Sequence, residues 1–299
     1  MKILVTGSSG FVGQNLVSFL KNSSDYEVIE INLRNGVPLD FPSAHVVIHL
    51  AGKAHDLKKT SEEKEYYDVN FELTKEVFGR FLKDPFSQIF IFMSSVKASK
   101  DVVVGDLTEE TKCEPMTPYG KSKLFAEQFI IDNIGGDKKY FILRPCMIHG
   151  PNNKGNLNAL YKLVIKKLPW PLGAFENKRS FCSIDNLLFV IDELIKSRNI
   201  PSGIYNVADD EALSTNEVIN IISRVLGVKT KLLKISPKII SFMARIGDRI
   251  KMPMNSENLQ KLTQSYVVSN RKVKNSIGKP LPYSSEKGMI KTIQSFKIN

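Results

Sequence analysis

Residues 2–13 read KILVTGSSGFVG, and this stretch decides the fold class. The run at 2–6 is apolar and rich in β-branched residues, a pattern typical of a buried parallel strand. Gly7, Gly10 and Gly13 follow as a glycine-rich turn, and Phe11 begins a segment with apolar residues at helical spacing. A strand, a glycine turn and a helix in this order predict a phosphate-binding turn of the dinucleotide-binding type.

Glycine suits such a turn because its backbone turns tightly and approaches a pyrophosphate with no Cβ in between. The following helix presents free N–H groups and a partial positive charge to the phosphates. We therefore expect a dinucleotide to contact these residues of the turn: Gly7, Ser9, Gly10, Phe11, Val12 and Gly13.

The rest of the N-terminal half alternates strand and helix patterns. Strands are expected at 28–31, 46–50, 89–93 and 140–143, and helices at 62–83 and 119–131. This alternation predicts an α/β protein, a Rossmann-type doubly wound parallel sheet. Beyond about residue 150 the rhythm changes, and prolines separate shorter segments. We predict a dinucleotide-binding domain over 1–165 and a smaller, mixed α/β substrate-binding domain over 166–299, with some segments returning to the first domain.

Two helical patterns stand out in the C-terminal half. Residues 214–226 carry a helical apolar face, and Ser214 with Glu217 three residues later predicts a capping box at its start. Residues 237–254 mix apolar and basic residues. Such a segment suits either packing on the small domain or contact with a membrane surface, and packing is the favoured interpretation.

Composition restricts the class of protein. The chain has 299 residues, of which 42% are hydrophobic and 24% charged, as in ordinary soluble domains. The net charge is +11, but the lysines are dispersed, which argues against nucleic-acid binding. Three cysteines without metal-ligand spacing indicate a reducing compartment and no metal site. With no signal segment and no apolar stretch approaching roughly 20 residues, we expect a cytoplasmic protein without a transmembrane segment.

The end of the second predicted strand bears on the choice of cofactor. An acidic residue there binds the ribose 2′-OH of NAD, whereas an arginine suits the 2′-phosphate of NADP. This chain has Asn32 at that position and Arg34 two residues later, which favours NADP, with NAD as the alternative. The connection from Leu33 to Val46 is short for a strand followed by a full crossover helix, and Asp40 within it is a candidate adenine contact.

A candidate acid–base pair lies on the helix predicted at 119–131. Tyr119 and Lys123 are four residues apart, hence on one face. A lysine ammonium and an oxidised nicotinamide favour the phenolate, so Tyr119 can exchange a proton while the cofactor moves a hydride. Ser94 and Ser95 follow the strand at 89–93, at the sheet edge where such folds bind ligands. His49, at the end of a buried strand, is expected to be structural rather than catalytic.

Several segments together resemble a known family: TGSSGFVG at 6–13, HLAG at 49–52, SSV at 94–96, YGKSK at 119–123, RP at 144–145, GPNNKGN at 150–156 and RSFCSIDNL at 179–187. They are similar to the extended short-chain dehydrogenase/reductase family of nucleotide-sugar epimerases, dehydratases and reductases. The resemblance implies that Ser95, Tyr119 and Lys123 form the catalytic set. It implies cofactor contacts at Leu50, Ala51, Gly52, Asn70 and Pro145, and substrate contacts at Ser94, Ser95, Lys97, Asn156 and Arg179.

Within the family, the chain is most similar to bacterial UDP-sugar 4-epimerases and 4-ketoreductases of surface-polysaccharide synthesis. Val96 and Lys97 follow Ser95 where dehydratases have Asp-Glu, which argues against dehydration. Arg34 favours an NADP-dependent 4-ketoreductase of a UDP-linked sugar. A 4-epimerase with tightly bound NAD and a non-catalytic NADP(H)-binding sensor remain the alternatives. Family resemblance also implies a possible homodimer through the helices expected at 62–83 and 119–131.

Overall fold

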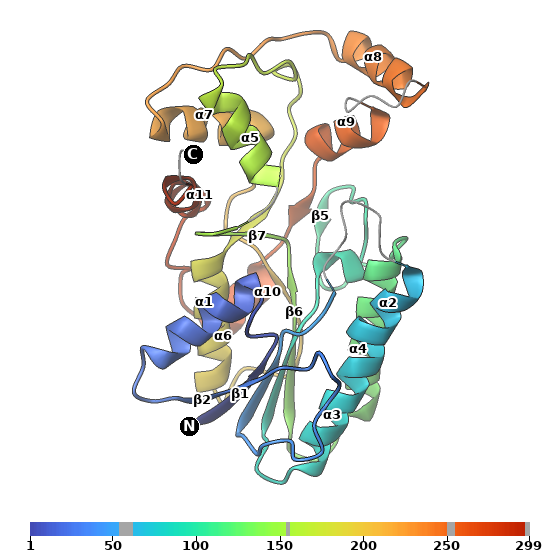
Figure 1. Ribbon diagram of the computed structural model, residues 1–299, viewed down its shortest axis with the longest axis vertical. Helices are drawn as coiled ribbons and strands as arrows, with labels where there is room; N and C mark the ends of the chain where they lie inside the picture. The colour runs from blue at the N-terminus through green and yellow to red at the C-terminus, as the bar shows by residue number, and fades with distance from the viewer. Residues whose placement is uncertain (54–61, 154–155, 250–254, 297–299) are drawn as a thin grey trace.

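The computed structural model describes residues 1–53, 62–153, 156–249 and 255–296 (Figure 1). A six-stranded sheet forms the base of the molecule, with its strands in the order β2-β1-β3-β4-β6-β9 and every neighbouring pair parallel. Its strands are β1 (Lys2–Thr6), β2 (Glu27–Ile31), β3 (Val46–His49), β4 (Ile89–Met93), β6 (Lys139–Pro145) and β9 (Gly203–Val207).

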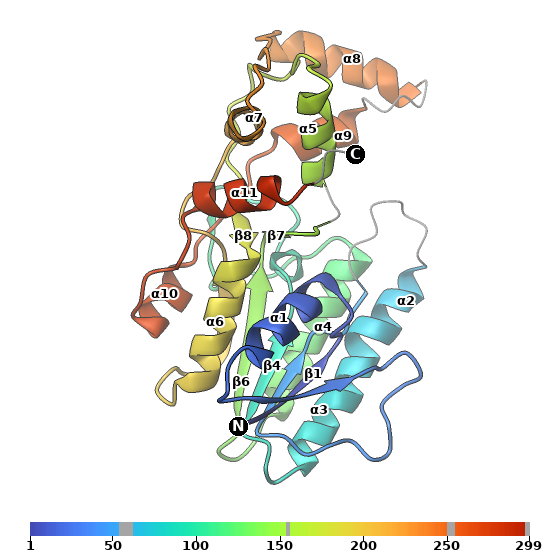
Figure 2. The ribbon, with the colours of Figure 1, turned by 60° about the vertical axis from the view of Figure 1, so that its left-hand side comes forward.

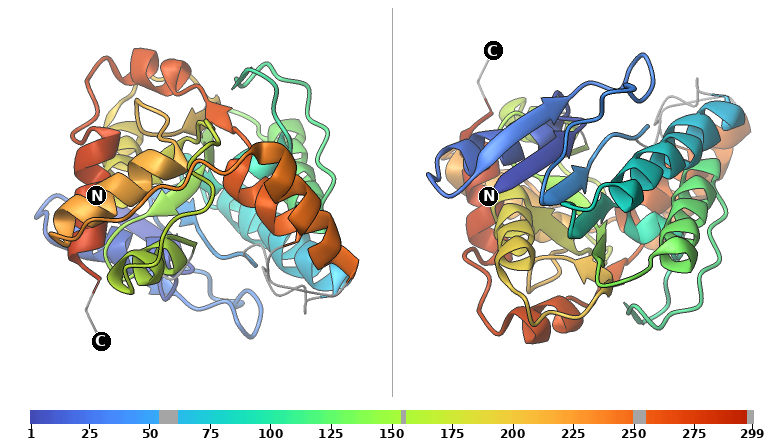
Figure 3. Two further views of the ribbon diagram at one scale, coloured as in Figure 1. Left: turned by 90° about the horizontal axis from the view of Figure 1, so that it is seen from above. Right: turned by 90° about the horizontal axis from the view of Figure 1, so that it is seen from below.

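Helices cover both faces of this sheet (Figure 1, Figure 3). One face carries α1 (Phe11–Lys21), α6 (Ile184–Lys196) and α10 (Arg271–Ile277), and the other α2 (Glu63–Tyr67), α3 (Leu73–Lys83) and α4 (Pro118–Asn133). Successive strand residues point to opposite faces. Ile3 and Val5 accordingly join the apolar core that includes α1 and α6, whereas Leu4 joins the core that includes α3. The predicted doubly wound α/β fold is confirmed.

The predicted helix over 62–83 contains a local irregularity. A π-helical turn, Asp68–Glu72, joins α2 to α3, and the buried Asn70 lies within it. Such turns insert an extra residue into a helix and re-aim side chains, and they occur often at functional sites. The connection over 32–45 contains no helix, in agreement with its shortness.

A second lobe lies beyond the carboxyl ends of the strands (Figure 1, Figure 2). Its helices are α5 (Asn156–Ile165), α7 (Thr215–Val225), α8 (Pro237–Arg249), α9 (Ser256–Thr263) and α11 (Ser285–Gln294). Short parallel pairs link the two lobes: β7 (Met147–His149) with β8 (Phe181–Ser183), and β5 (Asp106–Leu107) with β10 (Val267–Val268). The capping box predicted for Ser214 and Glu217 is present at the start of α7.

The segment predicted to pack on the small domain forms α8 over 237–249, and residues 250–254 lie outside the described ranges. Ile240, Ala244 and Gly247 are buried, so the expected packing holds for one face of this helix. None of the helices within the described ranges is long and apolar enough to cross a membrane.

Candidate active site

The glycine turn between β1 and α1 has the geometry that a phosphate requires. Gly7 has φ of 70°, and a Cβ added there would lie 2.5 Å from the backbone nitrogen of Ala51. A Cβ on Gly13 would lie 2.2 Å from the carbonyl oxygen of Gly7, so both positions exclude larger residues. Gly10 is exposed, and α1 begins after it with no side-chain cap. The first N–H groups of α1 are therefore available to an anion.

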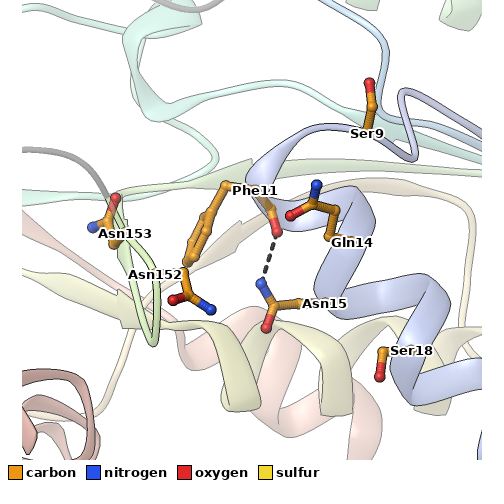
Figure 4. Close-up of a pocket in the computed structure, with 7 residues that line it drawn as sticks. All are labelled: Ser9, Phe11, Gln14, Asn15, Ser18, Asn152 and Asn153. Atoms are coloured by element: carbon orange, nitrogen blue, oxygen red, sulfur yellow. Dashed lines mark hydrogen bonds between the residues drawn. The ribbon is translucent and has the colours of Figure 1, made fainter. Parts of the chain in front are cut away.

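A cavity of about 470 Å³ opens beside this turn (Figure 4). It is lined by Ser9, Phe11, Gln14, Asn15, Ser18, Asn152 and Asn153. The Asn15 amide donates to the carbonyl oxygen of Phe11 at 2.8 Å, which fixes that side chain on the first turn of the helix. Ser9 and Phe11 were predicted as cofactor contacts, whereas Asn152 and Asn153, in the turn after β7, belong to the GPNNKGN segment at 150–156 and were not predicted to line this cavity.

The end of β2 presents an amide and a guanidinium. The Asn32 side-chain oxygen accepts a hydrogen bond from the Arg34 backbone N–H at 3.0 Å. Both side chains are exposed, as is Asp40 further along the loop. Glu30, the neighbouring carboxylate, pairs with Lys21 of α1 at 2.7 Å. Arg34 is therefore the first exposed charged group in the sequence after the end of β2.

The first turns of α4 carry the acid–base pair. Thr117 caps this helix by accepting from the Gly120 N–H at 3.2 Å. One turn of helix separates Tyr119 from Lys123, whose ammonium donates to the carbonyl oxygen of Met93 at 2.8 Å. Burial lowers the pKa of Lys123 to about 8, opposed in part by the Glu127 carboxylate.

Tyr119 contacts Ser95, which the sequence predicts to belong to the catalytic set. Its side chain is hydrogen-bonded to Ser95, the residue two positions beyond β4. Burial raises the pKa of Tyr119, and the bond to Ser95 acts in the opposite direction. The tyrosine is therefore a protonated hydroxyl at neutral pH, in contact with a second hydroxyl.

Ser95, Tyr119 and Cys146 line two cavities at once. The smaller, of about 240 Å³, includes the predicted cofactor contacts Leu50, Gly52 and Pro145 together with the predicted catalytic Lys123. The larger, of about 560 Å³, extends under the second lobe and includes Lys97 and Arg179, both predicted substrate contacts. A proton donor at the boundary of two cavities can serve a reaction between one molecule in each.

Asn70 connects the backbone of the smaller cavity to α4. Its amide donates to the Ser122 hydroxyl and to the carbonyl oxygen of Lys53, both at 3.1 Å. Its oxygen accepts from the Lys53 N–H at 2.8 Å. Gly52 lies between these groups: a Cβ there would come within 2.9 Å of the Asn70 oxygen and 3.0 Å of the Lys123 nitrogen. The π-helical turn thus places Asn70 where it orders the loop after β3.

Ser94 lines the smaller cavity, but its hydroxyl donates into a buried ion pair. The acceptor is the Glu127 carboxylate, whose two oxygens share the Nε–H of Arg144 at 2.9 and 3.2 Å, and one of them also accepts from its Nη2. Both charged side chains are 1% exposed. This group joins β4, α4 and β6 directly beneath the site. No sequence signal predicts the pair, because its members are 17 residues apart on different elements.

Basic side chains gather in the larger cavity. Lys97, Arg179 and Lys261 line it, together with the carboxylates of Asp101 and Glu257. The Lys97 ammonium donates to the Asp101 carbonyl oxygen at 2.9 Å, and Arg179 donates to the Lys261 carbonyl oxygen. Burial lowers the pKa of Lys97, with Asp101 opposing. Lys261 was not predicted. Asn156 begins α5, and its side chain lies outside the described part of the structure.

His49 is structural in its contacts. Its two ring nitrogens are hydrogen-bonded to the Thr6 and Thr74 hydroxyls, at 2.7 and 3.0 Å. Its side chain is fully buried, and burial lowers its pKa to about 3. A neutral imidazole that is bonded on both sides holds β1, β3 and α3 together beneath the glycine turn.

Comparison with known proteins agrees with this arrangement. The sequence profile of the NAD dependent epimerase/dehydratase family matches residues 3–208. The chain belongs to this family. UDP-glucose 4-epimerase of Vibrio cholerae is 30% identical over 318 residues, covering 98% of this chain and 95% of the relative. GDP-6-deoxy-D-mannose reductase of Pseudomonas aeruginosa is 23% identical over 254 residues, covering 78% of this chain and 83% of the relative.

A solved structure extends the likeness to the fold. RMD from Pseudomonas aeruginosa, complexed with NADPH, superposes with a TM-score of 0.76 at 20% identity, covering 98% of this chain and 97% of that one. The family resemblance noted in the sequence is confirmed. The protein is an enzyme of the family of NAD-dependent nucleotide-sugar epimerases and reductases.

The glycine turn and the smaller cavity of this protein together fit a dinucleotide. Gly10 and the uncapped start of α1 leave backbone N–H groups open to a pyrophosphate, and the smaller cavity provides space beside Tyr119 and Lys123. Within the described ranges, no group of three or more His, Cys, Asp or Glu side chains is placed to hold a metal ion. Cys113, Cys146 and Cys182 are free thiols.

Proposed function

We propose that the protein is an NADP(H)-dependent reductase that reduces a 4-keto UDP-(N-acetyl)-deoxyhexose at C4. The observation that supports this most is the shared wall of the two cavities, where Tyr119 and Ser95 face both. The smaller cavity is lined in part by Leu50, whose backbone lies against Gly7 of the glycine turn, and its size suits a nicotinamide ring. The larger contains Lys97, Arg179 and Lys261, which suit the diphosphate of a sugar nucleotide.

Each catalytic residue has a distinct task in the proposed reaction. When bound, the nicotinamide supplies the hydride. Ser95 donates a hydrogen bond to the oxygen at C4 and so orients the carbonyl. Tyr119 donates its proton to that oxygen as general acid. The Lys123 ammonium, one helical turn away, stabilises the phenolate that remains on Tyr119.

The preference for NADP rests on Arg34. Its exposed guanidinium lies two residues beyond Asn32, and the nearby Glu30 carboxylate is paired with Lys21. A guanidinium binds a phosphate through two parallel hydrogen bonds, so it suits the 2′-phosphate of NADP. A carboxylate at the position of Asn32 would repel that group.

The alternative proposal is a UDP-sugar 4-epimerase with tightly bound NAD. The 30% identity to the Vibrio cholerae epimerase over nearly the whole chain supports it. An epimerase keeps its cofactor and returns the hydride to the other face of the sugar, whereas a reductase exchanges its cofactor every cycle. A non-catalytic dinucleotide sensor is disfavoured, since such a protein has no use for Ser95, Tyr119 and Lys123 assembled together.

One experiment separates these proposals. Purified protein is assayed with NADPH and a 4-keto UDP-sugar, and we expect one NADPH oxidised per sugar reduced. An Arg34→Ala variant should lose its preference for NADPH over NADH, whereas Arg198→Ala, an exposed arginine on the turn after α6, should keep it. NAD that survives gel filtration, with interconversion of UDP-sugars and no net NADPH oxidation, would establish the epimerase instead.

A further inference from the structure

Helix α8 presents an apolar surface that no other segment within the described ranges covers. Ile239, Phe242, Met243 and Ile246 are 54%, 64%, 50% and 43% exposed. Counted from Ile239, they lie three, four and seven residues on, so they form a single stripe along the helix. Ile240, Ala244 and Gly247 form a separate, buried face. Packing against the rest of the lobe thus buries one apolar face of α8 and leaves the other in contact with solvent.

A basic stripe adjoins the exposed apolar one. Lys238, Arg245 and Arg249 are all exposed and are separated by seven and four residues, which places them on one side of the helix. At about 100° per residue, this stripe lies roughly a quarter-turn from the apolar stripe, on the side away from the buried face. Among the residues that the structure describes, none of these three side chains forms an ion pair.

The segment over 229–249 is almost entirely basic in its charged residues. Lys229, Lys231 and Lys234 precede α8 and are exposed, and Asp248 is the one acidic residue of 229–249. Asp248 lies on the side of the helix opposite the apolar stripe, because nine residues from Ile239 correspond to about 180°. Its carboxylate accepts hydrogen bonds from the backbone N–H and hydroxyl of Ser256, at 2.8 and 2.6 Å. Positive charge therefore borders the apolar stripe without a carboxylate to balance it.

We propose that α8 docks the protein on the surface of an anionic lipid bilayer. An interfacial helix lies in the membrane plane with its apolar stripe at the boundary of headgroups and acyl chains, and its basic side chains reach the lipid phosphates. The exposed apolar stripe of α8 and the basic stripe beside it match that arrangement. α8 also lies at an extremity of the molecule, so that a flat surface meets this helix first (Figure 1, Figure 2).

A second copy of the chain fits this surface less well. A stable protein interface needs about 800 Å² from each partner and some 20–30 residues a side, far more than a stripe of four side chains. In an antiparallel symmetric pair of α8 helices, the stripe of Lys238, Arg245 and Arg249 would also lie beside its own copy, and like charges disfavour that. An anionic surface has the complementary charge.

Docking would bring the substrate cavity close to the membrane. α9 packs against α8, and its residues Glu257, Gln260 and Lys261 line the larger cavity. The cavity then lies one helix away from the lipid surface, whereas the sheet and the turn after α3 point away from it (Figure 1).

Vesicle sedimentation tests the proposal with the full chain. At about 0.1 M salt we expect the protein to sediment with vesicles of phosphatidylcholine and phosphatidylglycerol at 3:1, and at least tenfold less with phosphatidylcholine alone. Phe242→Ser/Ile246→Ser should lower binding to the anionic vesicles at least tenfold, because it removes the apolar stripe. Lys238→Gln/Arg245→Gln/Arg249→Gln should do the same and should reduce the salt dependence.

Matched variants exclude general effects of hydrophobicity or charge. Phe86→Ser removes an equally exposed phenylalanine (65%) after α3, and Lys83→Gln/Lys121→Gln/Lys166→Gln removes three exposed charges from other elements. Both controls should bind vesicles as the wild type does, and all variants should keep its melting temperature. Equal binding by the α8 variants and the wild type would overturn the proposal. So would a change of oligomeric state on substituting Phe242 and Ile246 without any vesicle binding, which would assign the stripe to a second copy of the chain.

Discussion

Tyr119 is the proposed proton donor, and removal of its hydroxyl alone tests this role. Phenylalanine keeps the ring and its contacts and removes the hydroxyl that is bonded to Ser95. We expect Tyr119→Phe to lower kcat about 10²–10⁴-fold, the usual contribution of a general acid. NADPH affinity and melting temperature should change little. The check is single-turnover NADPH oxidation beside Tyr140→Phe, a half-buried tyrosine of β6; full turnover by Tyr119→Phe would show that the catalytic assignment is wrong.

Lys123 makes activity depend on pH in a window that its burial sets. Its pKa in the folded protein is about 8, below the ordinary lysine value of 10.5. As the pH rises through about 8, the folded protein loses this ammonium and with it the stabilisation of the Tyr119 phenolate. We therefore expect kcat/KM for reduction to fall above pH 8.

Unlike kcat/KM, the stability of the fold should gain from the titration of Lys123 as the pH rises. Between pH 8 and 10.5 the unfolded chain keeps the Lys123 proton and the folded chain does not, so the contribution of Lys123 to the free energy of unfolding rises across that window. The pH profile of kcat/KM for Lys123→Gln is the control for the activity prediction. Its kcat/KM should be lower than that of the wild type at every pH, and the profile should lack the descending limb near pH 8. An unchanged limb in that variant would assign the titration to another group.

Gly13 is the position of the β1–α1 turn with the least space for a side chain. A Cβ there would come within 2.2 Å of the Gly7 carbonyl oxygen and 2.6 Å of the Ser8 Cα, both backbone atoms. Gly13→Ala must therefore shift the turn, and we expect at least a tenfold loss of NADPH affinity by fluorescence titration. Gly79→Ala is the matched control, since α3 has open space at that position. It should keep wild-type affinity and gain about 0.5–1 kcal/mol of stability.

Elements with a local sequence signal could be predicted, and those that depend on distant contacts could not. The capping box of Ser214 and Glu217 involves residues three apart, and the Tyr119/Lys123 pair of α4 residues four apart, so each can be recognised within a short stretch of sequence. The π-helical turn at 68–72 has no such signal, and its surroundings are set by distant residues, since α2, the turn and α3 all contact α4. Glu127 and Arg144 meet only once β6 and α4 are assembled. The catalytic helix was therefore predictable, whereas its buried ionic support was not.

The same distinction applies to the two lobes of the whole molecule. The phosphate turn and the catalytic residues lie in the first 145 residues, where strands and helices alternate regularly. The wall of the larger cavity draws on segments as far apart as Asp101, Arg179 and Lys261. Arg179 could be predicted from the family resemblance. Lys261 could not, because the placement of α9 depends on how the second lobe folds back over the sheet.

The division of the molecule into two lobes predicts separate responses to its two ligands. A ligand that binds only the folded state stabilises it by about 2.7 kcal/mol at a hundredfold excess over its Kd. We expect NADPH and UDP each to raise the melting temperature of the wild type. Arg179→Gln should abolish the shift with UDP and leave the shift with NADPH intact, since Arg179 lines only the larger of the two cavities. Arg198→Gln, on the turn after α6, should preserve both shifts. If Arg179→Gln weakened the NADPH shift as much as the UDP shift, the two cavities would not bind their ligands separately, and the larger one could not be assigned to the sugar nucleotide.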